Sequence, residues 1–340
     1  MAENIRTYEI SATDYHTAGE PFRIVTAGAP ALQGRTVLER RSWAHEHSDH
    51  VRALLTNEPR GHADMYGCFL IPPDDAGAVL GAVFFHKDGY STACGHGTIA
   101  LATWAVESGR VAAAPDGDTR FAVDVPSGRV GARVRTHAGA VQAVGFENVP
   151  AWVSARSARV ETSAGPVWAD ISYGGAFYAS VRAADLDLRV IPEHLPRLTA
   201  LGREVKWALD GSPGARHPVD DRLSGVYGTI WWEDVAPTAA QIHQRNVTIF
   251  ADGEVDRSPC GSGTSARLAL LAADGVVEPG RELVHESIVG SRFLGRILGT
   301  VEAHGRSAVL TEVEGRAHLT GRHTFVLEES DELGLGFQLR

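Results

Sequence analysis

The chain has 340 residues, of which 44% are hydrophobic and 22% are charged, as is usual for globular proteins. This length suits two domains of about 170 residues each, and the net charge of −10 argues against nucleic acid or an anionic membrane as a partner. No stretch approaches the roughly 20 apolar residues of a membrane-spanning helix, and the first residues lack the basic and apolar regions of a signal peptide.

The first forty residues predict strands separated by a polar break. Residues 7–10 are extended, residues 14–21 contain Gly and Pro and predict a break, and residues 22–25 predict a half-buried strand. His16 and Glu20 lie in the break. Two roles are open for them: catalysis, or hydrogen bonds that hold a strand-to-loop corner.

Residues 35–57 predict one or two amphipathic surface helices, because apolar residues are interspersed among charged ones. The histidines in this segment, at positions 45, 47 and 50, have no third ligand tied to them by a motif and are typical of a solvated face, so no metal site is predicted. Strands are predicted at 69–71 and 78–85, and Cys68 is expected to be a small buried hydrophobic residue.

One motif occurs twice, and the chain is organised around it. Residues 94–98 read Cys-Gly-His-Gly-Thr and residues 260–264 read Cys-Gly-Ser-Gly-Thr. Each motif precedes a largely apolar segment that predicts a buried helix, closed by Gly109 in the first copy and by Gly275 in the second. No two cysteines have a CxxC spacing, and a reducing cytoplasm, which keeps thiols free, is the expected location.

The second half repeats the scheme of the first. A stretch rich in Pro, Ser and Ala at 150–157 is the candidate boundary, residues 186–209 predict a helix interrupted at Pro192 and Pro196, and strands are predicted at 226–231 and 245–250. Several short strands are expected between 287 and 327. The pattern predicts a duplicated α/β unit in which strands surround a central apolar helix.

Each cysteine is predicted to stand at a helix start, where unpaired backbone N–H groups and the helix dipole favour an anion. The glycines allow a carboxylate to approach this backbone closely. The same field is expected to lower the thiol pKa toward neutrality. A thiolate on one face of a carbon and a thiol on the other is what inversion of that carbon requires, with Cys94 and Cys260 as the two acid–base groups.

Other interpretations stay open beside this one. A single cysteine before a helix is usually a small core residue, but two in matched settings favour a catalytic pair. His96 either assists Cys94 or bonds to local backbone, and Asp256 either holds a substrate ammonium, caps a turn or pairs with Arg257. A protein that only binds a small acid would also use two helix ends, whereas a cysteine hydrolase is disfavoured because no histidine beyond His96 is tied to a thiol by motif.

The chain resembles the proline racemase family, whose members are racemases and epimerases of proline and hydroxyprolines that use no pyridoxal cofactor. The segments that carry the resemblance are 14–21, 94–97, 174–178, 225–230 and 256–264. The resemblance implies an α+β, diaminopimelate-epimerase-like fold: two similar α/β domains with the active site in the cleft between them. We place the domains at 1–150 and 151–322 and expect the tail 323–340 to pack back on the first.

The resemblance also implies roles for individual residues. Cys94 and Cys260 correspond to the two bases, and the substrate-binding positions are Gly95, His96, Asp256, Gly261 and Ser262. No cofactor or metal is implied, and the partner is proline or a hydroxyproline. The oligomeric state is open, with a homodimer as the usual assembly of such proteins. The family includes trans-3-hydroxy-L-proline dehydratases, which commonly have Thr or Ser in place of one cysteine. The two cysteines favour inversion; segment 174–178 resembles the dehydratases, and that activity is the alternative.

The ring pocket is not identified by the sequence. Segments near Tyr66, Phe85, Tyr90 and Trp231 are candidates for closing over a pyrrolidine ring, and no pattern ranks them.

Overall fold

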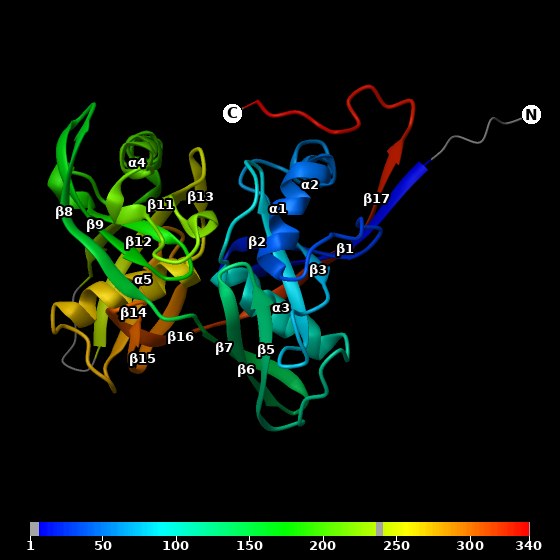
Figure 1. Cartoon of the computed structure of the whole chain (residues 1–340), viewed down its shortest axis with the longest axis horizontal. Helices are drawn as coiled ribbons and strands as arrows, with labels where there is room; N and C mark the ends of the chain where they lie inside the picture. Colours follow the sequence, from blue (N-terminus) through cyan, green and yellow to red (C-terminus); the bar gives the residue numbers. More distant parts are fainter. Residues whose placement is uncertain (1–6, 236–240, 340) are drawn as a thin grey trace, which may run out of the picture.

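The computed structural model describes residues 7–235 and 241–339. Within these residues the fold is a mixed α/β fold with many strands and few helices (Figure 1). The helices are α1 (Val37–His47), α2 (Asp49–Thr56), α3 (Gly95–Glu107), α4 (Leu195–Leu209) and α5 (Gly261–Ala273). The strands are β1 (Thr7–Thr17), β2 (Glu20–Ala27), β3 (Tyr66–Ile71), β4 (Leu80–His86), β5 (Gly117–Val125), β6 (Gly128–His137), β7 (Ala140–Glu147), β8 (Trp152–Thr162), β9 (Gly165–Tyr173), β10 (Phe177–Arg182), β11 (Val226–Asp234), β12 (Gln241–Phe250), β13 (Glu254–Asp256), β14 (Glu282–Ser287), β15 (Arg292–Ala303), β16 (Arg306–Gly315) and β17 (Ala317–Glu328).

Two buried helices, α3 and α5, are each surrounded by strands. Helix α3 packs against β1, β2, β6, β7 and β17, and α5 packs against β8, β9, β10, β15 and β16. A helix that is apolar on every side must be buried on every side, and residues 99–102 of α3 and 268–271 of α5 are all buried. The predicted central helices and the glycines that close them are confirmed, since Gly109 and Gly275 follow the helix ends with φ of 73° and 67°.

The two groups of strands are joined through β7 and β16, which pair antiparallel from Glu147 to Val144 and from Glu312 to Gly315. The chain passes from the first group to the second just after β7, and β17 then returns and pairs with β1 along its whole length. This return begins at Ala317, six residues before the tail that was predicted to pack on the first half. Figure 1 shows β17 lying beside β1 at the far edge of the first group.

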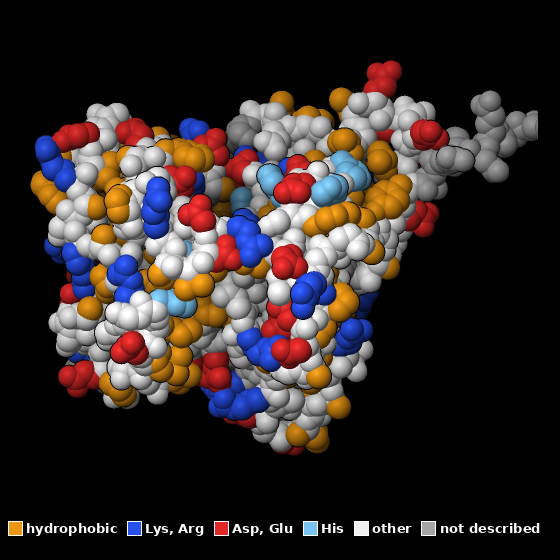
Figure 2. Space-filling view, in the orientation of Figure 1, with side chains coloured by type: hydrophobic (Ala, Val, Ile, Leu, Met, Phe, Trp, Pro, Cys, Tyr) orange, Lys and Arg blue, Asp and Glu red, His pale blue; other side chains and the backbone are white. Residues whose placement is uncertain are grey.

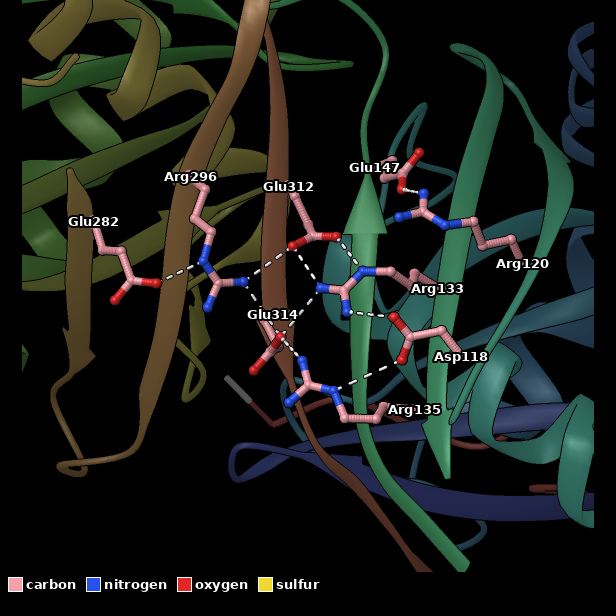
Figure 3. A network of polar contacts seen from close by, with 9 residues as sticks. All are labelled: Asp118, Arg120, Arg133, Arg135, Glu147, Glu282, Arg296, Glu312 and Glu314. Atoms are coloured by element: carbon pink, nitrogen blue, oxygen red, sulfur yellow. Dashed lines mark hydrogen bonds and ion pairs between the residues drawn. The ribbon is translucent and has the colours of Figure 1, made fainter. Parts of the chain in front are cut away.

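A network of arginines and carboxylates crosses the β7–β16 junction (Figure 3). Arg133 on β6 bonds Glu312 at 2.7 Å and Asp118 at 3.2 Å, and Arg296 on β15 bonds Glu312 at 3.0 Å. The Glu312 side chain is only 5% exposed. Burial by itself would raise the pKa of the Glu312 carboxyl, but Arg133 and Arg296 outweigh it, and the pKa lies below its usual value.

Replacing Arg133 by Met should lower the free energy of unfolding by about 1–3 kcal/mol, because a buried carboxylate loses the hydrogen bonds of one of its two arginines. Chemical denaturation at neutral pH measures the loss. The matched control is Arg120→Met, because Arg120 is 62% exposed and pairs with Glu147; this change should cost no more than about 1 kcal/mol. Equal losses in the two variants would contradict a structural role for the network.

Three predictions about elements were wrong, for identifiable reasons. Segment 14–21 was predicted to be a break, but it is part of a hairpin whose turn is only Ala18-Gly19. Asp14 remains in the strand because its carboxylate pairs at 2.8 Å with Arg23 on the neighbouring strand. Pro196 does not interrupt a helix but lies in the first turn of α4, where its missing N–H is harmless. The strands from 292 to 328 are long, with 12, 10 and 12 residues.

Candidate active site

The first thiol lies at the start of α3. Cys94 is the N-cap residue, with an extended backbone (φ −152°, ψ 98°), and its Sγ accepts the N–H of Gly97 at 3.2 Å. The Thr98 hydroxyl donates to the carbonyl of Cys94 at 2.8 Å. The thiol therefore takes the place that a Ser or Asp oxygen usually occupies at a helix start.

The second thiol lies at the start of α5 in a different backbone conformation. Cys260 has φ +62° and ψ 102°, in the left-handed half of the map, which costs about 1–3 kcal/mol for a residue other than glycine. Its N–H donates to Ser258 Oγ at 3.0 Å, and its carbonyl accepts both the N–H and the hydroxyl of Thr264 at 2.7 Å. Local hydrogen bonds thus hold a strained residue in place.

The two helix starts meet end to end. A Cβ added to Gly95 would lie 2.5 Å from Cα of Gly261, and one added to Gly261 would lie 2.7 Å from Cα of Gly95. Only glycine permits this approach. The second glycine of each motif also has a packing role, because a Cβ on Gly97 or Gly263 would lie 2.7 or 2.8 Å from the neighbouring cysteine Sγ.

A small cavity, of about 10 Å³, lies between the helix starts. All seven residues that the sequence analysis placed at the site line this cavity: Cys94, Gly95, His96, Asp256, Cys260, Gly261 and Ser262. Both thiols are only 4% exposed. Residues separated by more than 160 positions therefore face one small space.

The predicted lowering of the thiol pKa values is wrong for this structure. Burial raises the pKa of the Cys94 and Cys260 thiols, and the nearby Asp256 carboxylate raises both further. The N–H groups of Gly97 and Gly263 act in the opposite direction, as expected of helix starts, but burial outweighs them. Both thiols are therefore protonated near neutral pH in this state, and forming a thiolate requires added positive charge.

Asp256 is the buried carboxylate of the cavity. Its Oδ1 accepts the N–H and the hydroxyl of Ser258 at 2.8 and 2.7 Å, so it caps the turn before Cys260. Burial raises its pKa to about 6. Arg257 instead pairs with Glu20 at 3.0 Å and with Asp64 at 3.4 Å, which leaves the Asp256 carboxylate facing the cavity without a cation among the described residues.

His96 lies beside the first thiol, with Nε2 3.5 Å from Cys94 Sγ. Its ring packs edge-on against Phe22 and Tyr66. Burial lowers its pKa to about 3, so the imidazole is neutral near pH 7. Of the two roles predicted for His96, the structure places its ring next to the Cys94 thiol rather than only in a hydrogen bond to local backbone.

His16 and Glu20 take the structural role. His16 Nδ1 accepts the N–H of Gly19 in the β1–β2 turn, and the ring lies 5.3 Å from that of His318. Glu20 is fully buried, and its carboxylate accepts the backbone N–H of Arg257 and pairs with the Arg257 guanidinium. Neither residue lines the cavity.

Three tyrosines complete the wall: Tyr66, which was a predicted candidate, and Tyr178 and Tyr227, which lie in segments that carry the family resemblance but had no predicted role. The Tyr178 hydroxyl bonds Ser262 Oγ at 2.7 Å and lies 3.8 Å from Cys260 Sγ. The Tyr66 hydroxyl contacts Ser91 Oγ and bonds the Tyr227 hydroxyl at 3.0 Å. Phe85, Tyr90 and Trp231 do not line the cavity themselves, but Ala93 and Tyr227, from the segments near Tyr90 and Trp231, do. No sequence pattern separates such tyrosines from core aromatics.

A second, larger hollow adjoins the cavity at Tyr227, which lines both. It lies between α1 and α4 and has basic and acidic side chains on its walls, among them Arg41, Lys206 and Asp252. Acidic and basic side chains are likewise intermixed over the face of the molecule shown in Figure 2. In the described part of the chain no group of three His, Cys, Asp or Glu residues is placed to hold a metal, and no helix there is long and apolar enough to cross a membrane.

Comparison with known proteins identifies the family. The model described as "Proline racemase" matches residues 12–338. The chain belongs to the proline racemase family. The 3-hydroxyproline 2-epimerase of Burkholderia multivorans is 45% identical over 335 residues, which cover 97% of this chain and 98% of the relative. The trans-3-hydroxy-L-proline dehydratase of Bacillus cereus is 41% identical, covering 96% and 97%.

Solved structures agree with the family and its fold. The hydroxyproline epimerase of Agrobacterium vitis, solved with bound trans-4-hydroxy-L-proline, has a TM-score of 0.90 and 31% identity, covering 98% of this chain and 96% of that one. A phenazine biosynthesis protein of the PhzF family from Bacillus anthracis has a TM-score of 0.57 at 11% identity, covering 94% and 99%. The second likeness concerns the fold alone.

Proposed function

We propose that this member of the proline racemase family is a cofactor-independent two-base epimerase or racemase that inverts Cα of proline or a hydroxyproline. The observation that carries the proposal is that two thiols, at the starts of two abutting helices, line one small cavity. We further propose that the two halves form a diaminopimelate-epimerase-like pair of domains, 1–150 with the returning tail and 151–322, in a cytoplasmic enzyme.

In the proposed mechanism, the substrate carboxylate binds the backbone N–H groups of residues 95–96 and 261–262. Asp256 pairs with the secondary ammonium, and this cation offsets the charge that otherwise raises the thiol pKa values. One thiolate removes the α-proton from one face while the other thiol donates a proton to the opposite face. In the reverse reaction the two cysteines exchange roles, so their apparent pKa values belong to the pair.

Asp256 should set the acid side of the pH profile. Its pKa of about 6 means that kcat/KM should fall below that pH, because the protonated carboxyl no longer pairs with the ammonium. His96, with its pKa of about 3, does not titrate in this range. In Asp256→Asn this acidic fall in kcat/KM should disappear. KM should rise about 10²-fold, because a buried charged pair with the substrate ammonium is lost. An acidic fall in kcat/KM that persists in the variant would contradict the assignment to Asp256.

The function itself is tested by product identity. L-Proline, trans-4-hydroxy-L-proline and trans-3-hydroxy-L-proline are each incubated with the enzyme, and the products are separated by chiral chromatography. Inversion yields the Cα epimer, and elimination of a 3-hydroxyl yields a cyclic imine. No reaction with any of the three would overturn the proposal, and binding without reaction would favour a protein that only binds small acids.

Elimination of water from trans-3-hydroxy-L-proline is the second candidate. It is favoured by relatives with that name, including the 44% identical dehydratase of Azospirillum brasilense. Elimination also begins with removal of the α-proton, after which the 3-hydroxyl leaves with a proton from a nearby acid. Tyr66, Tyr178 and Tyr227 line the cavity, and a tyrosine hydroxyl can donate a proton to a leaving group.

A further inference from the structure

One buried contact distinguishes the threonines at the two thiol sites. At each site a threonine hydroxyl donates to the cysteine carbonyl: Thr98 at 2.8 Å and Thr264 at 2.7 Å. Thr264 Oγ1 also lies 2.8 Å from Nδ1 of His285, on β14, whereas the Thr98 hydroxyl has no side-chain hydrogen bond within the described residues. The additional contact serves the cysteine with the strained backbone, at φ +62°.

The direction of this hydrogen bond follows from its surroundings. Thr264 Oγ1 faces the carbonyl oxygens of Cys260 at 2.7 Å and Pro259 at 3.2 Å, and both can only accept. The single hydroxyl proton is therefore directed at a carbonyl, and His285 must donate its Nδ1–H. The imidazole is fully buried, and its Nε2 has no partner in the described structure. Such an unpaired buried nitrogen is costly to keep.

We infer that His285 is a positioning residue for Cys260: through Thr264 it fixes the Cys260 carbonyl, and with it the direction of the thiol. His285 does not line the cavity, and its hydrogen bond in the described structure goes to Thr264 and not to Cys260. The inference deepens the proposed two-base function and rests on it. The two cysteines should therefore respond differently to loss of His285: proton transfer by Cys260 should be impaired, and proton transfer by Cys94 should stay intact.

The test compares His285→Leu with His285→Asn, whose amide can donate from nearly the same place as Nδ1. In the Leu variant, the kcat of inversion should fall about tenfold with KM unchanged, because only the alignment of an acid–base group is lost. Exchange of the α-hydrogen with solvent should persist for the enantiomer whose α-hydrogen faces Cys94. The Asn variant should restore inversion. Melting temperatures should stay within about 5 °C of the parent, which separates positioning from folding.

A double-mutant cycle with Thr264→Val provides the control. If His285 acts through Thr264, adding His285→Leu to Thr264→Val should have no further effect. Additive losses, equal impairment of both exchange reactions, or failure of Asn to rescue would overturn the inference. Alkylation by iodoacetamide gives a readout independent of turnover: His285→Leu should change the rate at Cys260 and not at Cys94. An altered alkylation ratio in a protein that inverts none of the substrates would reject the proposed function and keep the positioning role.

Discussion

Cys260→Ser should abolish inversion while leaving exchange of the α-hydrogen of one enantiomer. A serine hydroxyl is a far weaker acid than a thiol at the same place, and loss of one acid–base group costs about 10²–10⁴-fold in rate. Cys94→Ser should abolish inversion equally but preserve exchange of the opposite enantiomer. Proton NMR of each enantiomer in deuterated water measures both reactions for both variants.

Cys68→Ala is the matched control for these substitutions. Cys68 is also fully buried, on β3, and burial raises its pKa well above the usual value, but it does not line the cavity. Its loss should cost about 1–2 kcal/mol of stability through the lost packing and leave inversion unchanged. Inversion at the parent rate in either serine variant would remove that cysteine from the proposed pair.

Gly95→Ala and Gly261→Ala should each cause a large loss of activity. The new Cβ would lie 2.5 or 2.7 Å from the opposite glycine Cα, so the helix starts must separate. Each start carries one thiol and half of the proposed carboxylate site, and a misplacement of about 1 Å is expected to cost about 10²-fold in kcat. Steady-state inversion kinetics and melting temperature are measured together.

Gly299→Ala is the control for this prediction. Gly299 lies on β15, has ordinary φ, and has no atom within 4 Å of the position of a new Cβ. The substitution should change neither activity nor melting temperature. Full activity in Gly95→Ala would mean that the contact between the two helix starts is not needed for catalysis.

The site was more predictable than the strands that support it. A cysteine followed by Gly-x-Gly-Thr and an apolar run defines a helix start locally. Because this motif occurs at 94 and at 260, the site residues could be predicted on one further assumption, that the two helix starts meet. The tyrosines at 178 and 227 were not predicted, because buried aromatic residues in strands are usually core residues. What makes them part of the site is contact with Ser262 and Tyr66, on segments distant in the sequence.

The thiol pKa values could not be predicted for the same reason. A helix start acts through its own N–H groups, which the motif reveals, whereas burial depends on the whole fold. The Asp14–Arg23 pair shows the same limit for strands: segment 14–21, with its polar residues, Gly and Pro, predicts a break until the cross-strand arginine is known. The homodimer and the cytoplasmic location stay predictions.

The position of deuterium early in the reaction tests the two-base mechanism most directly. One pure enantiomer of the best substrate is incubated in deuterated water, and the reaction is stopped after a few per cent conversion. With two bases, the inverted product carries deuterium at Cα while the remaining substrate keeps hydrogen, because the proton is removed on one face and a different one is added on the other. Deuterium in the unconverted substrate at the same rate, or hydrogen retained in the product, would indicate a single base and contradict the paired roles of Cys94 and Cys260.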